Sequence, residues 1–430
     1  MARLGRNRVA SLLGLVLVAA LGMLPAQDTI TLESAIATAR EKRPGIAAMR
    51  AEAEAAAARV RQNKAAYYPQ IGSSGLAKAG LSGAMNGLEP VGIANSPFFR
   101  NFAEGIHVSH PGVDGGKVKY SVEFARAESL AAQADLDAAE AAVGLEVAEA
   151  YFEVLSQIAR LEAANRSIEG REAIQRQAKA FYEGGLRSRV DYALAQSAVA
   201  QGRVEQANAS SALQIAQIKL LRAMGQSLGQ QLELDQPSAP ERNAALEEML
   251  VEARELRPDL AAVRARRQAQ EMSVRRIEAQ YKPSLSMFFT GGWARFNPLA
   301  FSSLTSIGVG LAAPLFTFGK RGAEIAEAEA HLRRMDYHVE DLLQLIELDV
   351  RVAHRQLQAA SEVGPLIAIE VDAANDAVRL ARARYREQLG SAVEVTQAEA
   401  TLAAAETKVA KARYEVGAAQ ARLDYAVGRL

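Results

Sequence analysis

The stretch Ser302–Ala330, SSLTSIGVGLAAPLFTFGKRGAEIAEAEA, places two kinds of secondary structure on either side of one hinge. Residues 307–312 alternate large apolar side chains with glycine and alanine, and a period of two predicts a strand with two different faces. Pro314 should end the strand, because proline has no amide hydrogen to donate. After Gly319 the chain is rich in alanine and glutamate, which favour helix. A strand therefore leads directly into a long helix.

The same hinge occurs earlier in the chain, as His110–Lys117 (HPGVDGGK), and both hinges belong to a longer repeat. An offset of 203 residues carries Pro111 onto Pro314 and Gly116 onto Gly319, and an offset of 214 carries Arg43-Pro44 onto Arg257-Pro258. Two copies of so long a unit indicate an internal duplication rather than a solenoid. We predict a first repeat over residues 27–225, a linker over 226–243 and a second repeat over 244–430.

The first 26 residues have the pattern of a secretory signal peptide. Arg3, Arg6 and Arg8 precede an apolar run, and Pro25-Ala26 precedes a polar segment, so we expect cleavage after Ala26. The alternative is a membrane anchor, but the apolar run is interrupted and shorter than the ~20 residues that a spanning helix needs. The chain has no cysteine, which excludes both disulfide bonds and a lipid attached to an N-terminal cysteine.

The composition argues against several classes of function. The chain has 50 basic and 50 acidic residues, so no net charge attracts nucleic acid. His331, His338 and His354 lie on a predicted helix without the clustered ligands of a metal site. The segment Asp114–Lys117 lacks the spacing of a phosphate-binding loop, and no nucleophile–base arrangement stands out. We expect neither an enzyme nor a cofactor.

The repeat predicts a mixed fold of long helical hairpins and four antiparallel strands. The expected helices cover residues 31–66, interrupted at Pro44, 117–182, 186–225, 246–281, 320–385 and 389–428; the expected strands cover residues 71–83, 105–113, 284–294 and 302–313. A helix from 117 to 182 would be on the order of 100 Å long. Two shorter helices should stack end to end beside each long one, and Gly364-Pro365 should kink the second long helix.

The length of the strands favours a membrane. About 10 residues suffice for a tilted strand to cross a bilayer, and aromatic residues near the strand ends suit a girdle at its surfaces, namely Phe98, Phe99, Trp293, Phe296 and Phe301. Four strands cannot close a barrel, and open edges are not tolerated in lipid. We therefore expect oligomerisation, with twelve strands from three copies. A solvated helical rod is the alternative for the alanine-rich helices, but a rod would not need the strands.

Two segments predicted to form hairpin tips complete the pattern: residues 182–191, YEGGLRSRVD, and residues 385–394, YREQLGSAVE. With the duplication and the two hinges, the chain resembles the TolC-type outer-membrane efflux protein family, the outer membrane factors. The resemblance implies a homotrimer with a twelve-stranded β-barrel in the outer membrane of a double-membraned bacterium, embedded in its lipid, and an α-helical tunnel in the periplasm.

The resemblance also implies the function. The protein would be a passive exit duct in tripartite efflux or type I secretion, joined by a periplasmic adaptor to an inner-membrane pump of the RND, ABC or MFS type. The alternative function is a periplasmic helical scaffold or adaptor without pore activity.

The tip residues have a structural explanation that does not need the resemblance. Gly184 and Gly185 can supply the positive φ of a tight turn. Ser188 and Ser391 can cap the returning helices, and an acidic residue follows each serine after three positions, as in a capping box.

The resemblance adds functional expectations for the same tips. Glu394 would ring the periplasmic entrance with Asp191 nearby, while Gln397 stands where a second acid is expected. Tyr385 would hold the tip closed, and Gly390 replaces the basic residue that assists it. Adaptor docking would use a set of tip residues, namely Gly184, Gly185, Leu186, Ser188, Leu389, Gly390 and Ser391.

Overall fold

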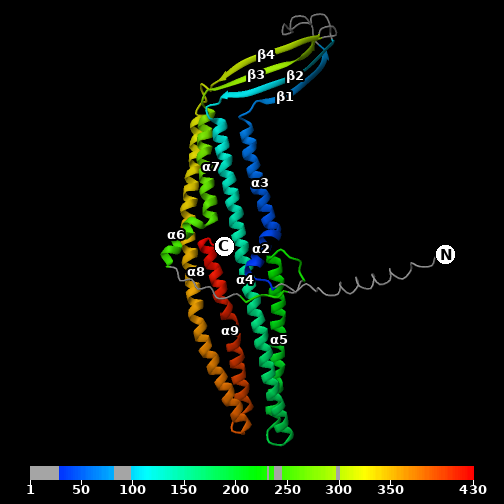
Figure 1. Ribbon diagram of the computed structural model, residues 1–430, viewed down its shortest axis with the longest axis vertical. Coiled ribbons are helices and arrows are strands. Elements are labelled where there is room, and N and C mark those ends of the chain that lie inside the picture. The colour runs from blue at the N-terminus through cyan, green and yellow to red at the C-terminus, as the bar shows by residue number, and fades with distance from the viewer. Residues whose placement is uncertain (1–28, 82–97, 230–231, 237–244, 297–300) are drawn as a thin grey trace, which may run out of the picture.

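A computed structural model describes residues 29–81, 98–229, 232–236, 245–296 and 301–430. The predicted signal peptide and half of the predicted linker, residues 230–231 and 237–243, lie outside these residues. The molecule is elongated, with a sheet at one end, two helical hairpin tips at the other, and two short helices near the middle (Figure 1).

The helices follow the duplication. The first repeat contains α2 (Leu32–Lys42), α3 (Pro44–Ala65), α4 (Lys117–Glu183) and α5 (Arg189–Ala223); the second contains α6 (Leu246–Leu256), α7 (Pro258–Gln280), α8 (Lys320–Arg386) and α9 (Ala392–Val427). The long helices α4 and α8 have 67 residues each. The interruption at Pro44 is confirmed. The prediction of one helix over 246–281 is wrong, because Pro258 starts a new helix after the extended residue Arg257.

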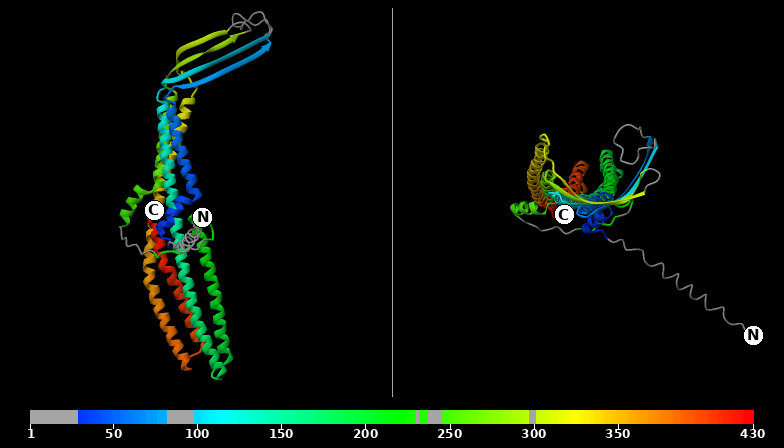
Figure 2. Two further views of the ribbon diagram at one scale, coloured as in Figure 1. Left: turned by 45° about the vertical axis from the view of Figure 1, so that its right-hand side comes forward. Right: turned by 90° about the horizontal axis from the view of Figure 1, so that it is seen from above.

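Short helices lie end to end beside each long one, as predicted: α3 and α5 beside α4, and α7 and α9 beside α8 (Figure 1). Helix α4 also packs against α7 and α9, so the two repeats form one curved wall (Figure 2). Helix α8 continues through Gly364 and Pro365 as a single element.

The four strands form one antiparallel sheet in the order β1 (Gln70–Leu81), β2 (Phe98–Val113), β3 (Ser284–Phe296) and β4 (Phe301–Ala312). The β2–β3 ladder joins the two repeats. Strand β4 ends before Pro314, as predicted. Strand β2 starts earlier than the predicted residue 105 but ends at Val113 as predicted, and Pro111 lies within it next to a register shift that accommodates the missing amide.

Glycine makes both strand-to-helix hinges possible. Gly116 has φ 96° and Gly319 has φ 86°, left-handed values at the residue before each long helix. In the first hinge the Asp114 carboxylate also accepts hydrogen bonds from the amides of Gly116 (2.9 Å) and Val118 (2.6 Å), which caps α4.

The duplication is visible in the packing at mid-length. Arg43 pairs with Glu146 at 2.5 Å in the first repeat, and Arg257 pairs with Asp349 at 2.9 Å in the second. These pairs hold the junctions between the short helices against the two long helices. They obey the two sequence offsets, so the duplication extends to side-chain contacts.

Candidate functional site

The sheet has one apolar face, which the register identifies residue by residue. In β3 and β4, Met287 pairs with Val309 and Phe289 with Ile307, so these four side chains share a face. The large exposed side chains of this face are Ile71, Ile106, Met287, Phe289, Trp293, Ile307, Val309 and Leu311. A sheet surface this apolar needs a non-aqueous neighbour.

The opposite face carries small and polar residues, and on it two rings approach glycines closely. A Cβ on Gly72 would come within 2.5 Å of the His107 ring, and one on Gly308 within 2.4 Å of the Phe288 ring. Glycine is therefore required for these rings to lie against the neighbouring strand. This face resembles the lining of a lumen rather than a second hydrophobic core.

Each end of the wall has an unpaired edge. Within the described part of the chain, strands β1 and β4 each pair with one strand, on one side only. Helix α8 continues the β4 edge and exposes apolar side chains with heptad spacing at positions 345, 348, 352, 366, 369 and 380. At the opposite edge, α5 exposes Val190, Leu194, Val204, Ile215 and Ile218. Both edges therefore expose unpaired strands and apolar side chains that packing against another surface would bury.

The first hairpin tip joins α4 to α5. Of its two glycines only Gly185 has a positive φ, 71°, whereas Gly184 has φ −80°, so the expectation that both supply a left-handed turn is wrong for Gly184. Ser188 occupies the N-cap position but its side chain makes no capping hydrogen bond. The capping-box expectation fails at this tip.

The second tip joins α8 to α9. The Ser391 side chain accepts a hydrogen bond from the Glu394 amide at 3.2 Å, so the predicted cap is present here. Gln388 adopts φ 62° at the position equivalent to Gly185, which is a strained conformation for a residue with a side chain.

Tyr385 is the largest fully buried side chain of this tip, with no exposed surface. Its ring packs against Phe181 of the first hairpin, with centroids 5.7 Å apart, and among the described residues its hydroxyl has no hydrogen-bond partner. Burial raises the pKa of Tyr385, Asp191 raises it further, and Arg187 opposes both. The structure thus brings Tyr385 and Asp191 together.

Arg187 links the two tips, and the sequence interpretation missed it. Its guanidinium donates a 2.7 Å hydrogen bond to the carbonyl of Gly390 and lies 5.5 Å from the centre of the Tyr385 ring. The two bonded residues are 203 positions apart, so they are repeat equivalents. The repeat offset of 203 could have predicted this contact, because it shows that the basic residue missing at Gly390 is present at the equivalent position, Arg187, of the other tip.

The expected entrance acid, Glu394, is half exposed and lies 3.6 Å from Arg384 of its own hairpin. Gln397 is exposed one turn further along α9. The expected docking residues divide by exposure. Gly184, Gly185, Leu186, Ser188 and Leu389 are exposed, Ser391 is half buried, and Gly390 is buried beneath Arg187.

We predict that Arg187→Ala loosens the second tip without unfolding the hairpins. It removes a charge-assisted hydrogen bond of about 1.5–3 kcal/mol, so amide hydrogen exchange at residues 389–392 should accelerate roughly tenfold or more. Tyr385→Phe should leave this exchange unchanged, because the hydroxyl makes no hydrogen bond. Equal effects of the two substitutions would contradict this geometry.

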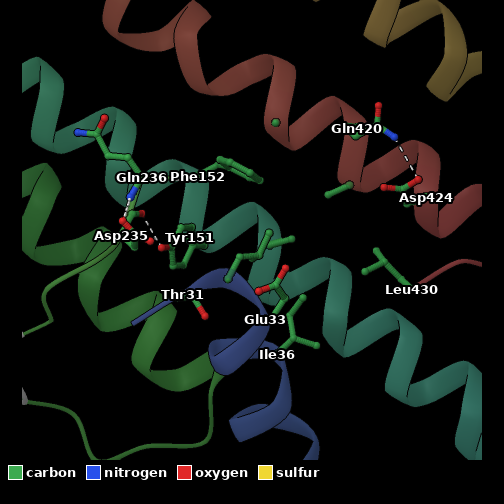
Figure 3. Close-up of a pocket in the computed structure, with 14 residues that line it drawn as sticks. Thr31, Glu33, Ile36, Tyr151, Phe152, Asp235, Gln236, Gln420, Asp424 and Leu430 are labelled. Carbon is green, nitrogen blue, oxygen red and sulfur yellow. Dashed lines mark hydrogen bonds between the residues drawn. The ribbon is translucent and has the colours of Figure 1, made fainter. Parts of the chain in front are cut away.

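A cavity of about 430 Å³ lies at mid-length between α2, α4 and α9 (Figure 3). Beside it, the Tyr151 hydroxyl is within 2.8 Å of the Ile30 carbonyl and 2.7 Å of the Asp235 carbonyl. Burial, with the negative charge of Asp235, raises the pKa of Tyr151 to about 12. The tyrosine therefore stays protonated, and its hydroxyl holds the segments at Ile30 and Asp235, which lie at the two ends of the first repeat, against α4.

No helix among the described residues is long and apolar enough to cross a membrane. Within the same part of the chain, no group of three or more acidic or histidine side chains could hold a metal ion.

A duplicated wall of long helical hairpins continuing into a four-stranded sheet defines the class of the protein, a subunit of an outer-membrane channel. The family model described as "outer membrane efflux protein" matches residues 35–226 and 249–429, so the chain belongs to that family and its place is the outer membrane. The family is one of channel proteins rather than enzymes. No curated protein matches the chain closely enough in sequence to count as a relative.

Solved structures show the same fold. The outer membrane protein VceC from Vibrio cholerae is similar with a TM-score of 0.79 and 19% identity, over 92% of this chain and 96% of that one. CusC, whose structures concern folding and transmembrane channel formation, has a TM-score of 0.81 and 20% identity, over 92% of each chain. The MtrE outer membrane channel of Neisseria gonorrhoeae, in its open state, has a TM-score of 0.78 and 18% identity, over 92% and 88%.

Proposed function

We propose that three copies of the chain close into a passive exit duct of a tripartite efflux system, with a twelve-stranded barrel in the outer membrane and a helical tunnel in the periplasm. The observation that carries the proposal is the pair of unpaired edges. Sheet and helices both end in surfaces that a second copy can cover, β4 and α8 on one side and β1, α3 and α5 on the other.

The strand directions fit such a ring. The order β1-β2-β3-β4 is antiparallel throughout, so β4 and the β1 of a neighbouring copy also run in opposite directions. Head-to-tail contacts of this kind form a closed ring when the rotation closes. Closure removes every strand edge, as a membrane requires, and the apolar sheet face then meets lipid.

The hairpin tips suit the periplasmic entrance and the docking of a periplasmic adaptor, which would connect the duct to an inner-membrane pump of the RND, ABC or MFS type. Exposed Leu186 and Leu389 offer apolar contacts at the tip surface. Residues 1–26 would direct export as a cleaved signal peptide. Type I secretion would use the same duct, and the apolar tips do not distinguish the two systems.

Conductance of the purified protein in a planar bilayer tests the duct, with Glu394→Ala beside the wild type. Glu394 is half exposed and only loosely paired with Arg384, so its charge should attract cations to the entrance. We expect a cation-preferring pore whose selectivity falls in the variant. If the pore is unchanged by the substitution, the duct proposal stands but Glu394 has no role at the entrance. A soluble protein that never inserts would favour a periplasmic scaffold.

A further inference from the structure

A buried ion pair lies between the two hairpins, further from the tips than Tyr385. Glu399 of α9 has only 6% of its side chain exposed and pairs with Arg382 of α8, whose Nε lies 2.7 Å and Nη2 2.5 Å from Oε1. A carboxylate this buried needs its partner, because removing one member leaves an uncompensated charge.

Helix α4 of the first hairpin approaches this pair through a glycine. A Cβ on Gly170 would lie 2.6 Å from Nη2 of Arg382 and 3.2 Å from Oε2 of Glu399. Both atoms are the ends of flexible side chains, so an added methyl group would displace the ion pair rather than the backbone. The fit between the hairpins at this level therefore depends on the absence of a side chain at residue 170.

A second carboxylate lies two turns further along α9 and is less well compensated. Glu406 faces Arg166 of α4 at 3.9 Å, longer than a hydrogen bond, and Arg166 is mostly exposed. A cavity of about 150 Å³ separates the hairpins here, and Arg166, Ser167, Arg382, Glu399 and Glu406 are the polar residues that line it. Among the described residues the buried Ser167 hydroxyl has no partner.

We propose that Gly170, Arg382, Glu399 and Glu406 form a charge layer that sets how tightly the second hairpin is held against the first. Helix α4 can pack closely against the Arg382–Glu399 pair, because Gly170 has no side chain at the point of contact. Glu406 opposes the same packing, because its carboxylate is mostly withdrawn from water, with 21% of the side chain exposed, and its partner Arg166 is no closer than 3.9 Å. These are positioning residues for the periplasmic entrance, and that consequence rests on the proposed function.

The opposition by Glu406 depends on pH. Burial raises its pKa above 4.5, the Glu399 charge raises it further, and Arg166 partly offsets both. Parting the hairpins would return Glu406 to water and its pKa to the ordinary value. The packed state therefore binds the proton more tightly, so acidification favours packing and deprotonation favours parting.

The separation of the hairpins can be measured directly, because the chain has no cysteine. Glu169→Cys on α4 and Thr407→Cys on α9 are exposed positions for a pair of spin labels on the full-length protein. From about pH 8 to about pH 5 the ratio of packed to parted hairpins should rise, towards a limit of roughly tenfold for each unit of pKa difference that is reached only below the ordinary pKa of glutamate. An unchanged distance distribution over this range would overturn the proposal.

Substitutions should act in opposite directions. Glu406→Gln should favour packing and remove the pH dependence, whereas Glu399→Gln should favour parting because it leaves Arg382 unpaired. Gly170→Ala should also favour parting.

The double variant Arg382→Gln, Glu399→Gln restores a neutral pair and should pack as the wild type does, which separates loss of the pair from misfolding. Glu162→Gln, an exposed carboxylate on α4, is the matched control.

Shifts of Glu406→Gln and Glu399→Gln in the same direction would overturn the proposal. Bilayer conductance of the same variants should follow hairpin separation, rising for Glu399→Gln and falling for Glu406→Gln. If the label distances behave as expected but no variant conducts, the charge layer stands and the proposed duct fails. If the pores conduct alike while the distances differ, the layer does not control the entrance and the proposal is wrong.

Discussion

Replacing Leu366 and Ile369 together by aspartate should convert the proposed trimer into monomers. Both side chains lie on the exposed heptad stripe of α8, at 65% and 66% exposure in the single chain. Burial of each would contribute about 1.5–3 kcal/mol per interface, and a charge in the same place costs several kcal/mol. The proposed trimeric ring has three such interfaces, so the free energy of association lost by the double substitution is about three times that of one interface. Light scattering of the detergent-solubilised protein gives the mass.

The matched control is Val409→Asp on α9. Val409 is 38% exposed, but α9 lies between α4 and α8 rather than at an edge of the wall. This variant should stay trimeric. If both variants remain trimers and conduct in a bilayer, the α8 stripe does not face a second copy, and the unpaired edges lose their explanation.

Gly428→Ala should be among the most destabilising single substitutions in the helical part. Gly428 ends α9 with φ 88°, and an added Cβ would lie 2.9 Å from the backbone of Leu256 and Arg257. The left-handed conformation costs alanine about 1–2 kcal/mol, and overpacking against backbone adds about 1–3 kcal/mol. The apparent Tm followed by circular dichroism should fall by roughly 2–6 °C.

The internal duplication provides a second glycine in the same structural position, and a glycine within a helix provides a control substitution. Gly225 ends α5 with φ 69°, and its added Cβ would lie 3.0 Å from the backbone of Lys42, so Gly225→Ala should destabilise in the same way. Gly322→Ala, in α8 with nothing within 4 Å of the added Cβ, should be neutral or stabilising. Equal Tm changes in all three variants would contradict the close packing at the helix junctions.

Local sequence was sufficient where one rule decides the backbone. The alternation at residues 307–312 predicts β4, Pro44 predicts the break after α2, and the proline and glycine residues at 110–117 and 314–320 predict the two hinges. The left-handed φ of Gly116 and Gly319 was seen only in the structure. Pro111 lies inside β2, as in the predicted strand over 105–113, at a register shift against β3. The break at Pro258 was overlooked although Arg257-Pro258 repeats Arg43-Pro44.

The positions of the two hairpin tips were predicted, but the contacts within them were not. The sequence located both tips, since glycine, serine and acidic residues cluster where a helix must reverse. It could not show that Arg187 reaches Gly390 or that Gly390 is buried, because that contact joins residues 203 positions apart. Nor could it show that Glu399 is buried, because burial of a charge is decided by a neighbouring helix and the glycine on it.

The sequence by itself determined the duplication, the alternation of long helices and strands, and the hinges, because these depend on periodicity and on the backbone freedom of single residues. Only the tertiary structure decided which edges stay open, which face of the sheet is apolar, and which charges between the hairpins are buried. Those features depend on which distant segments lie side by side, and the pairing of residues far apart in a chain is fixed only when the whole chain packs.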